Sequence, residues 1–336
     1  MSASISTLVA ILAVSLLANA ALAFFLLRVT RALRRIDAAE AYWSIAVFEV
    51  ESPLALQEAA NAAKPSVTAR DVHDVKASFV ADPFLWRRDG RWHLFFEVME
   101  KRRGLGSIGF ATSEDGNDFR YEKIALRERF HLSYPYVFES GSETFMVPEC
   151  GETGTVRLYR ARRFPDLWDF EATLLSGAKF VDASLFEHGG LWWMFTSVPT
   201  HDVLRLHFSR SLLGPWTEHP ASPIVSDDPH AARPAGRVIA LEDGRLLRFA
   251  QDDEPTYGWK VFAFAITRLD DRVYEEAPAL DHAALAPSHY GWNKYKMHHV
   301  DAHRLASGRW MACVDGQGYP LDRRKPRPAK TPLVKT

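Results

Sequence analysis

Apolar residues follow two different patterns along this chain. Residues 5–27 form an uninterrupted run of 23 uncharged, mostly apolar residues, whereas from about Tyr42 short alternating runs recur between Gly, Asp and Pro turns. About 20 apolar residues suffice for a helix to cross a bilayer. Alternation with a period of two is typical of half-buried strands. Because only residues 53–63 keep a helical period after Tyr42, the pattern predicts one membrane-spanning helix followed by an all-β domain.

The all-β part repeats one phrase, in which an aspartate is followed by an apolar strand, a glycine turn and an aromatic strand. Clear copies begin at Asp82, Asp182 and Asp301, and weaker copies begin at Tyr134 and Arg233. The steps between these anchors are 52, 48, 51 and 68 residues, which is blade length with an insertion in the fourth unit. Each unit contains four strand-like runs. We therefore expect a five-bladed β-propeller, with an irregular β-sandwich as the competing fold.

Three segments follow from these patterns. We expect a transmembrane anchor with a basic flank at residues 1–35, the propeller at residues 36–321, and a basic, disordered tail at residues 322–336. The last unit is short after Cys313, and a spare strand-like run at residues 43–48 precedes the first unit. We expect this run to complete the fifth blade and close the ring.

Charge narrows the classes of partner. Lysine plus arginine (41) nearly balances aspartate plus glutamate (42), and no basic stripe is interleaved with aromatic residues. These features argue against a nucleic-acid ligand. The two cysteines, Cys150 and Cys313, lie outside any metal-binding or redox motif and are interpreted as free thiols.

The basic residues next to the apolar run predict its orientation. None precedes the run, and four follow it directly: Arg28, Arg31, Arg34 and Arg35. By the positive-inside rule this flank stays cytoplasmic, so we expect a single-pass protein of the plasma (inner) membrane with a cytoplasmic propeller. A secretory signal, with small-residue cleavage motifs at residues 18–23, is the alternative and implies a periplasmic or lumenal domain.

Polar residues recur where the first two strands of each unit meet. In a four-stranded blade the innermost strand begins, and the second strand ends, at one face of the ring, here called the central mouth. Counting from the anchors places these residues there: Asp82, Glu97, Tyr134, Glu149, Asp182, Arg233, Gln251 and Asp301, with His298 and His299 just before the last. Asp315 occupies the equivalent position in the fifth unit. Of these residues, Asp315 and Glu97 are the two for which a structural role is most strongly indicated.

These residue types predict a carbohydrate site. Carboxylates supply general acid and base catalysis at a glycosidic bond, and Arg, Gln and His bind hydroxyls or a phosphate leaving group. Crowded carboxylates raise the pKa of at least one member, as a general acid requires. Trp292, in a Gly-containing stretch before the fifth unit, is a candidate for stacking on a sugar ring. The competing interpretation is that the carboxylates only accept hydrogen bonds from backbone amides of neighbouring blades.

A metal site is not expected. Residues 297–303 contain three histidines and one aspartate, which are suitable ligand types. However, neighbouring side chains on a strand point to opposite faces. We therefore predict neither a metal nor a bound cofactor, and the small-molecule partner considered is a nucleotide-sugar donor.

Several stretches resemble a known family, the propeller domain at the N-terminus of plant glucosamine inositolphosphorylceramide transferases. The resemblance covers roughly residues 43–316 and is carried by residues 79–84, 131–138, 157–161, 213–220, 232–237 and 248–252. More distantly, the chain is similar to the five-bladed superfamily of invertases, levansucrases and arabinanases. The resemblance implies a base or nucleophile at Asp82, a related position at Asp182, where Ala183 replaces the usual proline, and an acid at Glu149. In the plant proteins a separate glycosyltransferase domain follows the propeller.

Three functions remain open at this point. The first is a membrane-anchored glycosyltransferase acting on a lipid-linked or cell-surface glycan precursor, with Asp82 or Glu149 as base and Arg233 and His298 on the phosphate. The second is a glycoside hydrolase or phosphorylase that uses Asp82 and Glu149 as its carboxylate pair, and the third is a non-catalytic glycan-binding propeller. The sequence identifies neither the sugar, nor the acceptor, nor the oligomeric state.

Overall fold

The computed structural model describes residues 4–40, 42–288 and 290–319, in two units that divide at residue 41. The predicted basic tail at residues 322–336 lies outside the described residues. The first unit is helix α1 (Ile5–Glu40). Its segment Ala13–Thr30 has a mean hydropathy of 1.8 and exposes its apolar side chains, so the helix is long and apolar enough to cross a membrane.

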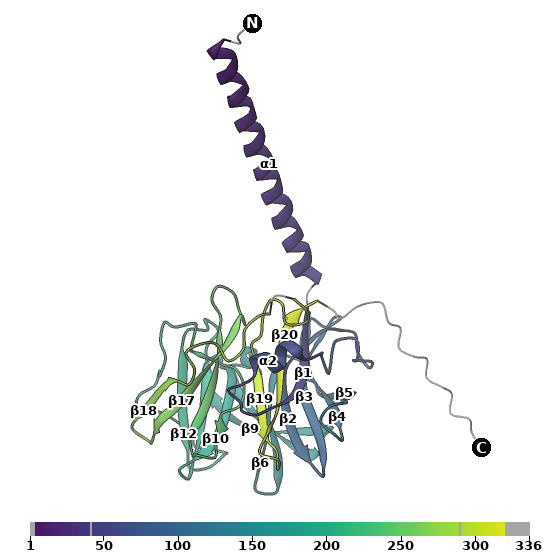
Figure 1. Ribbon diagram of the computed structural model, residues 1–336. Helices are drawn as coiled ribbons and strands as arrows, with labels where there is room; N and C mark the ends of the chain where they lie inside the picture. Colours follow the sequence, from purple (N-terminus) through teal and green to yellow (C-terminus); the bar gives the residue numbers. More distant parts are fainter. Residues whose placement is uncertain (1–3, 41, 289, 320–336) are drawn as a thin grey trace, which may run out of the picture. The chain divides into compact units, whose positions relative to one another are not determined.

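The second unit is a five-bladed β-propeller (Figure 1), which confirms the predicted fold class. Each blade is a separate antiparallel sheet, and the strands of blades 1 to 3 follow one another along the chain. Blades 1 and 2 contain β2 (Ala77–Arg88), β3 (Arg91–Glu100), β4 (Leu105–Ser113), β5 (Arg120–Leu126), β6 (Ser133–Ser140), β7 (Glu143–Glu149), β8 (Thr155–Arg163) and β9 (Leu167–Ser176). Blade 3 contains β10 (Val181–His188), β11 (Leu191–Ser197), β12 (Leu204–Ser209) and β13 (Thr217–Glu218).

The last two blades are less regular. Blade 4 contains β14 (Arg233–Pro234), β15 (Ile239–Ala240), β16 (Leu246–Asp252), β17 (Lys260–Leu269) and β18 (Tyr274–Pro278). The insertion after β18 bridges back to this blade, where Leu285 pairs with Val261. Blade 5 contains β19 (Val300–Arg304), β20 (Trp310–Gly318) and β1 (Tyr42–Val50). Two short helices, α2 (Gln57–Ala62) and η1 (Gly151–Thr153), complete the unit.

The N-terminal strand β1 closes the ring. It pairs antiparallel with β20, from Tyr42 opposite Gly318 to Val50 opposite Trp310, so the predicted run at residues 43–48 lies in the fifth blade. On the other side, β19 contacts β2 of the first blade. Joining both ends of the domain in one sheet protects strands that would otherwise form open edges.

Apolar packing between blades holds the ring together. Phe84 of β2, Tyr136 of β6 and Leu185 of β10 belong to one buried cluster that spans three blades. Ile45 of β1 lies in a second cluster with Leu94 of β3, which joins the fifth blade to the first. Burying one such side chain contributes about 1.5–3 kcal/mol, so the alternating apolar residues of the sequence account for the stacking of the blades.

Candidate functional site

Three inner strands contain, in their first half, a residue in the left-handed backbone region. Asp82, Tyr134 and Asp182 have φ angles of 53°, 46° and 51°. At each of them the register with the second strand shifts. Such a bulge re-aims side chains at the end of a strand. This shared local geometry explains why the repeat anchors, and not the regular strand residues that follow, lie at the central mouth.

Hydrogen bonds between blades hold this strained backbone. The amide of Tyr134 donates to Asp82 Oδ2 at 3.2 Å, and the amide of Asp82 donates to Asp315 Oδ2 at 2.9 Å. A left-handed non-glycine residue costs about 1–3 kcal/mol. The carboxylates of Asp82 and Asp315 thus accept hydrogen bonds from backbone amides of neighbouring blades, which is the structural alternative to a catalytic role.

Asp82, His298 and Asp315 form a buried group, here called the Asp82 cluster. His298 Nδ1 lies 2.8 Å from Asp315 Oδ1, and His298 Nε2 lies 3.6 Å from Asp82 Oδ1. The indole of Trp43 stacks on the imidazole with ring centres 4.0 Å apart and an angle of 19°. Asp315 therefore orients His298, and the free edge of the imidazole faces Asp82.

The pKa values in the Asp82 cluster are strongly perturbed. Burial raises the pKa of Asp82 to about 7, opposed by His298 and reinforced by the charges of Asp315 and Asp182. Burial alone would lower the pKa of His298, but the charge and hydrogen bond of Asp315 raise it. The pKa of Asp315 is lowered, because His298 outweighs the effect of burial. A carboxyl that titrates near neutral pH is suited to general base catalysis.

A second group surrounds Arg233 at the start of β14. Arg233 Nε donates to Asp182 Oδ2 at 2.6 Å, and Gln251 Nε2 donates to the same oxygen at 3.0 Å. Arg233 Nη1 lies 3.0 Å from His201 Nε2, and the guanidinium lies 4.9 Å from the ring centre of Tyr257. Asp182 and Gln251 are buried; Asp182 fixes the guanidinium, and Gln251 holds the same carboxylate oxygen.

Glu97 and Glu149 differ in how their carboxyl groups are used. Burial raises the pKa of Glu97 well above its usual range, and the charges of Asp82 and Glu149 add to this effect. Glu97 Oε1 has no hydrogen-bond partner among the described residues, and His131 Nε2 lies 3.4 Å away. Glu149, by contrast, accepts from the Ser133 hydroxyl and the Gly151 amide, both at 2.8 Å. The raised pKa favours the protonated form of Glu97, which is the form that a general acid requires.

The structure corrects the predicted ligand contacts of Tyr134 and His299, because it places both side chains inside the ring. The hydroxyl of Tyr134 is hydrogen-bonded to Ser184 Oγ at 2.7 Å and to the carbonyl of Gly236 at 2.9 Å. His299 is fully buried against Phe84 and Tyr134, with ring centres 4.6 and 5.2 Å away, and burial lowers its pKa to about 4. Neither side chain reaches a ligand at the central mouth, because each is covered by neighbouring inner strands.

The structure also corrects the predicted ligand contacts of Asp301 and Trp292. Asp301 is fully buried and accepts from the Leu85 amide at 2.8 Å and from Arg237 Nε at 2.9 Å. Trp292 is 3% exposed, and its indole N–H donates to the carbonyl of Ala60 in α2 at 3.3 Å. Trp292 is therefore a core residue and cannot stack on a sugar.

The structure adds residues that the sequence interpretation missed. Tyr257 lies on the loop between β16 and β17, is 39% exposed, and meets His298 edge to face at 5.4 Å. Lys296 Nζ lies 5.7 Å from the Tyr257 ring centre. These residues lie outside the repeated phrase. The signal that could have found them is Gly258, which follows Tyr257 in the loop after β16, a strand that ends at the central mouth.

Within the described part of the chain, the Asp82 cluster is also a group of side chains that could hold a metal ion. One ligand atom each from Asp82, His298 and Asp315 lies within 4.8 Å of the others. However, Asp315 accepts from the Asp82 amide and binds His298 Nδ1. These hydrogen bonds account for the cluster without an ion, so we assign no metal role to it.

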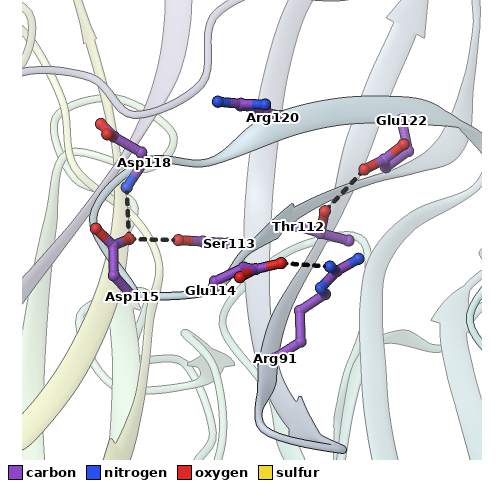
Figure 2. A pocket seen from close by; sticks show the side chains of 8 residues that line it. All are labelled: Arg91, Thr112, Ser113, Glu114, Asp115, Asp118, Arg120 and Glu122. Atoms are coloured by element: carbon purple, nitrogen blue, oxygen red, sulfur yellow. Dashed lines mark hydrogen bonds and ion pairs between the residues drawn. The ribbon is translucent and has the colours of Figure 1, made fainter.

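A separate hollow of about 520 Å³ lies on the outer strands of blade 1 (Figure 2). Arg91 Nη2 pairs there with Glu114 Oε1 at 2.6 Å. Asp115 accepts from the Ser113 hydroxyl and the Asn117 amide, both at 2.8 Å. These hydrogen bonds stabilise the turn between β4 and β5. We therefore interpret the residues that line the hollow as structural and not as a catalytic site.

The fold defines the class of the protein as a five-bladed propeller of the type seen in glycosidases. The structure is similar to an exo-β-1,3-galactanase from Clostridium thermocellum, with a TM-score of 0.53 and 13% identity over 63% of this chain and 51% of that one. It is also similar to the catalytic domain of an α-L-arabinofuranosidase from Coprinopsis cinerea, with a TM-score of 0.54 and 12% identity over 70% and 90%. At this identity the likeness is one of fold.

Sequence similarity gives the particular family. The chain belongs to the family described as glucosamine inositolphosphorylceramide transferase 1, N-terminal, whose model matches residues 36–317. Glucosamine inositolphosphorylceramide transferase 1 of Oryza sativa subsp. indica is 36% identical over 314 residues, which is 87% of this chain and 42% of that protein. The chain thus spans about two fifths of the length of the curated relatives it matches.

Proposed function

We propose that this chain is a membrane-anchored glycosyltransferase-type enzyme that acts on a lipid-linked or cell-surface glycan precursor. The family match over residues 36–317 carries the proposal, because the relatives are named glucosamine inositolphosphorylceramide transferase. The helix α1 supports a substrate at a membrane surface. We propose a phosphate-bearing glycolipid as the class of acceptor, in keeping with the name of the relatives.

In the proposed reaction Asp82 is the general base. Its carboxylate takes the proton of the acceptor hydroxyl, the acceptor oxygen forms a bond to the anomeric carbon, and the phosphate oxygen leaves with the bonding electrons. A pKa of about 7 suits this role at neutral pH. Glu149 is the less suitable base, because both of its oxygens already accept hydrogen bonds.

The proposed donor is a nucleotide-sugar, and the reaction requires cations near its diphosphate. Arg233 and His298 were the sequence candidates for this contact. Arg233 supports it through its charge at the central mouth, although its Nε is used by Asp182. His298 is better suited to orient Asp82, since its ring is buried under Trp43 and held by Asp315.

Donor binding and transfer test this proposal in separate steps. The full-length protein in detergent is first heated with a series of nucleotide-sugars, and we expect at least one to raise its Tm. Transfer of a radiolabelled sugar to a membrane lipid extract is then measured. Asp82→Asn is expected to keep the donor-dependent rise in Tm and to lose transfer. No rise in Tm with any donor, or full transfer by Asp82→Asn, would contradict the proposal.

Hydrolysis or phosphorolysis of a glycoside is the second candidate. The protonated state favoured at Glu97 supports it, because a carboxylic acid near Asp82 supplies the acid and base that such a reaction needs. Release of a free sugar from aryl glycosides in water, or of a sugar phosphate in inorganic phosphate, identifies this class. Glycan binding that survives Asp82→Asn without turnover by the wild type would instead indicate a non-catalytic binding propeller.

The membrane orientation is part of the proposal. Four arginines directly after the apolar run favour a cytoplasmic propeller in the plasma membrane. Protease added to intact spheroplasts should leave a C-terminal epitope tag undigested. Digestion of the tag from outside would place the propeller in the periplasm.

A further inference from the structure

Tyr257 is an aromatic residue whose side chain contacts residues of the central mouth and remains partly exposed. Its ring meets the imidazole of His298 at 5.4 Å and 90° and that of His201 at 5.5 Å and 76°. The guanidinium of Arg233 lies 4.9 Å from its centre. Despite these contacts the residue is 39% exposed. An exposed ring next to buried polar groups is the kind of surface on which a sugar ring packs.

The loop that carries Tyr257 is fixed to the Asp82 cluster. Gly258 has a φ angle of 65°, and a Cβ atom there would lie 2.8 Å from His298 Cδ2. The Gly258 amide donates to Asp253 Oδ1 at 2.5 Å, and Asp253 Oδ2 lies 2.6 Å from His201 Nδ1. Because Gly258 allows this close approach to His298 and its amide is held by Asp253, Tyr257 is already positioned before a ligand arrives.

Lys296 is a cation beside this ring without an anionic partner. Its ammonium is half-buried, and within the described part of the chain no carboxylate oxygen lies within 4.0 Å of it. Burial lowers its pKa, opposed by the more distant charge of Asp253. Arg233, by contrast, is paired with Asp182 at 2.6 Å. A partly desolvated ammonium gains most from an anion that a ligand brings.

We infer that Tyr257 and Lys296 form a subsite for a sugar that carries an anionic group, with the sugar ring on Tyr257 and the anion on Lys296. The inference deepens the proposed function and rests on it for the presence of a glycan ligand. A glycosyl phosphate and a uronic acid share the required chemistry. Tyr257 lies beside His298, whose Nε2 is 3.6 Å from Asp82 Oδ1, so the subsite binds the part of the substrate next to the reacting bond.

Four probes test the subsite by titration of the detergent-solubilised full-length protein. They are glucose 1-phosphate, glucuronic acid, the neutral methyl glucoside and inorganic phosphate. The wild type should bind at least one anionic sugar more tightly than the methyl glucoside and inorganic phosphate. The stronger of the two anionic sugars identifies whether phosphate or carboxylate is preferred.

Substitutions separate the two halves of the subsite. Lys296→Gln should weaken binding of the preferred anionic sugar by about tenfold and leave the methyl glucoside unchanged. Tyr257→Ala should weaken both sugars by about tenfold, while Tyr257→Phe keeps wild-type affinity. Lys294→Gln is the matched control, because the ammonium of Lys294 already pairs with the Tyr319 hydroxyl at 3.2 Å. This control variant should bind every probe as the wild type does.

Three results would overturn the inference. They are a wild type that binds none of the four probes, a Lys296→Gln protein that binds the anionic sugars as tightly as the wild type, and unchanged sugar binding after Tyr257→Ala. The proposed function fails separately. Selective binding that is lost in Lys296→Gln, combined with no transfer from any nucleotide-sugar, would refute transfer and leave the subsite intact.

Discussion

Replacing Asp82 by asparagine tests whether the buried carboxyl of the Asp82 cluster lowers stability at neutral pH. Burial raises the pKa of Asp82 from 3.8 to about 7. Because the folded-state value exceeds the unfolded one, the protonated carboxyl favours folding below pH 3.8, and this contribution is lost as the pH rises to about 7. Asparagine has no charge to bury, and its oxygen can still accept the Tyr134 amide hydrogen.

The magnitude follows from the two pKa values. At 1.36 kcal/mol per pKa unit, the wild type should lose about 2.5 kcal/mol more stability than the variant between pH 5 and pH 8. For a domain of this size that difference corresponds to about 5 °C in Tm. The Tm of the full-length protein in detergent is measured by tryptophan fluorescence at several pH values. Between pH 5 and pH 8, the Tm of Asp82→Asn should rise by this amount relative to the Tm of the wild type.

Asp89 provides a matched control, because its φ angle is 52° and its side chain is 94% exposed. Asp89→Asn makes the same chemical change on the same type of backbone without burial, and its Tm should follow the wild type across the pH range. If the Tm difference between Asp82→Asn and the wild type stays constant from pH 5 to pH 8, the carboxyl does not titrate as the structure indicates.

Three further substitutions test other parts of the structure by their effect on Tm and on donor binding. Trp292→Ala should lower stability by about 3–5 kcal/mol, since it empties a buried core position, whereas a loss of less than 1 kcal/mol would contradict the core assignment. Arg237→Met should cost about 3–5 kcal/mol, because it leaves the fully buried Asp301 without its 2.9 Å partner, and an unchanged Tm would refute that pairing. Gly258→Ala should reduce both Tm and donor binding, whereas Gly244→Ala, with a φ angle of 83° and no atom within 4 Å of a Cβ, should reduce Tm alone. Normal donor binding by Gly258→Ala would show that its loop does not form part of the central mouth.

The carboxylates of the candidate site illustrate how far the sequence could lead. Asp82 and Asp182 were found by spacing, because each repeats the same place in its blade. The sequence could not separate the roles of Glu97 and Glu149, since hydrogen bonding and burial at those positions depend on the neighbouring blade. Among the described residues one oxygen of Glu97 has no hydrogen-bond partner, while the Ser133 hydroxyl and the Gly151 amide donate to the oxygens of Glu149.

Trp292 and Tyr257 show the same limit for aromatic residues. Both precede or follow a glycine in a loop, so their local sequences give no reason to choose between core and surface. Trp292 is buried because Ala60, 232 positions earlier, accepts its indole hydrogen. Tyr257 is partly exposed on a loop whose Gly258 leaves no room for a side chain against His298.

The sequence by itself determined the long apolar helix, which could span a membrane, and the five-bladed ring. Both depend on apolar patterns of fixed length or period, and these patterns are local properties of the chain. Only the tertiary structure decided which polar residues meet at the central mouth and which are buried between blades. The physical reason is that left-handed residues and register shifts in the first half of three inner strands set the side-chain directions, and hydrogen bonds between blades hold them.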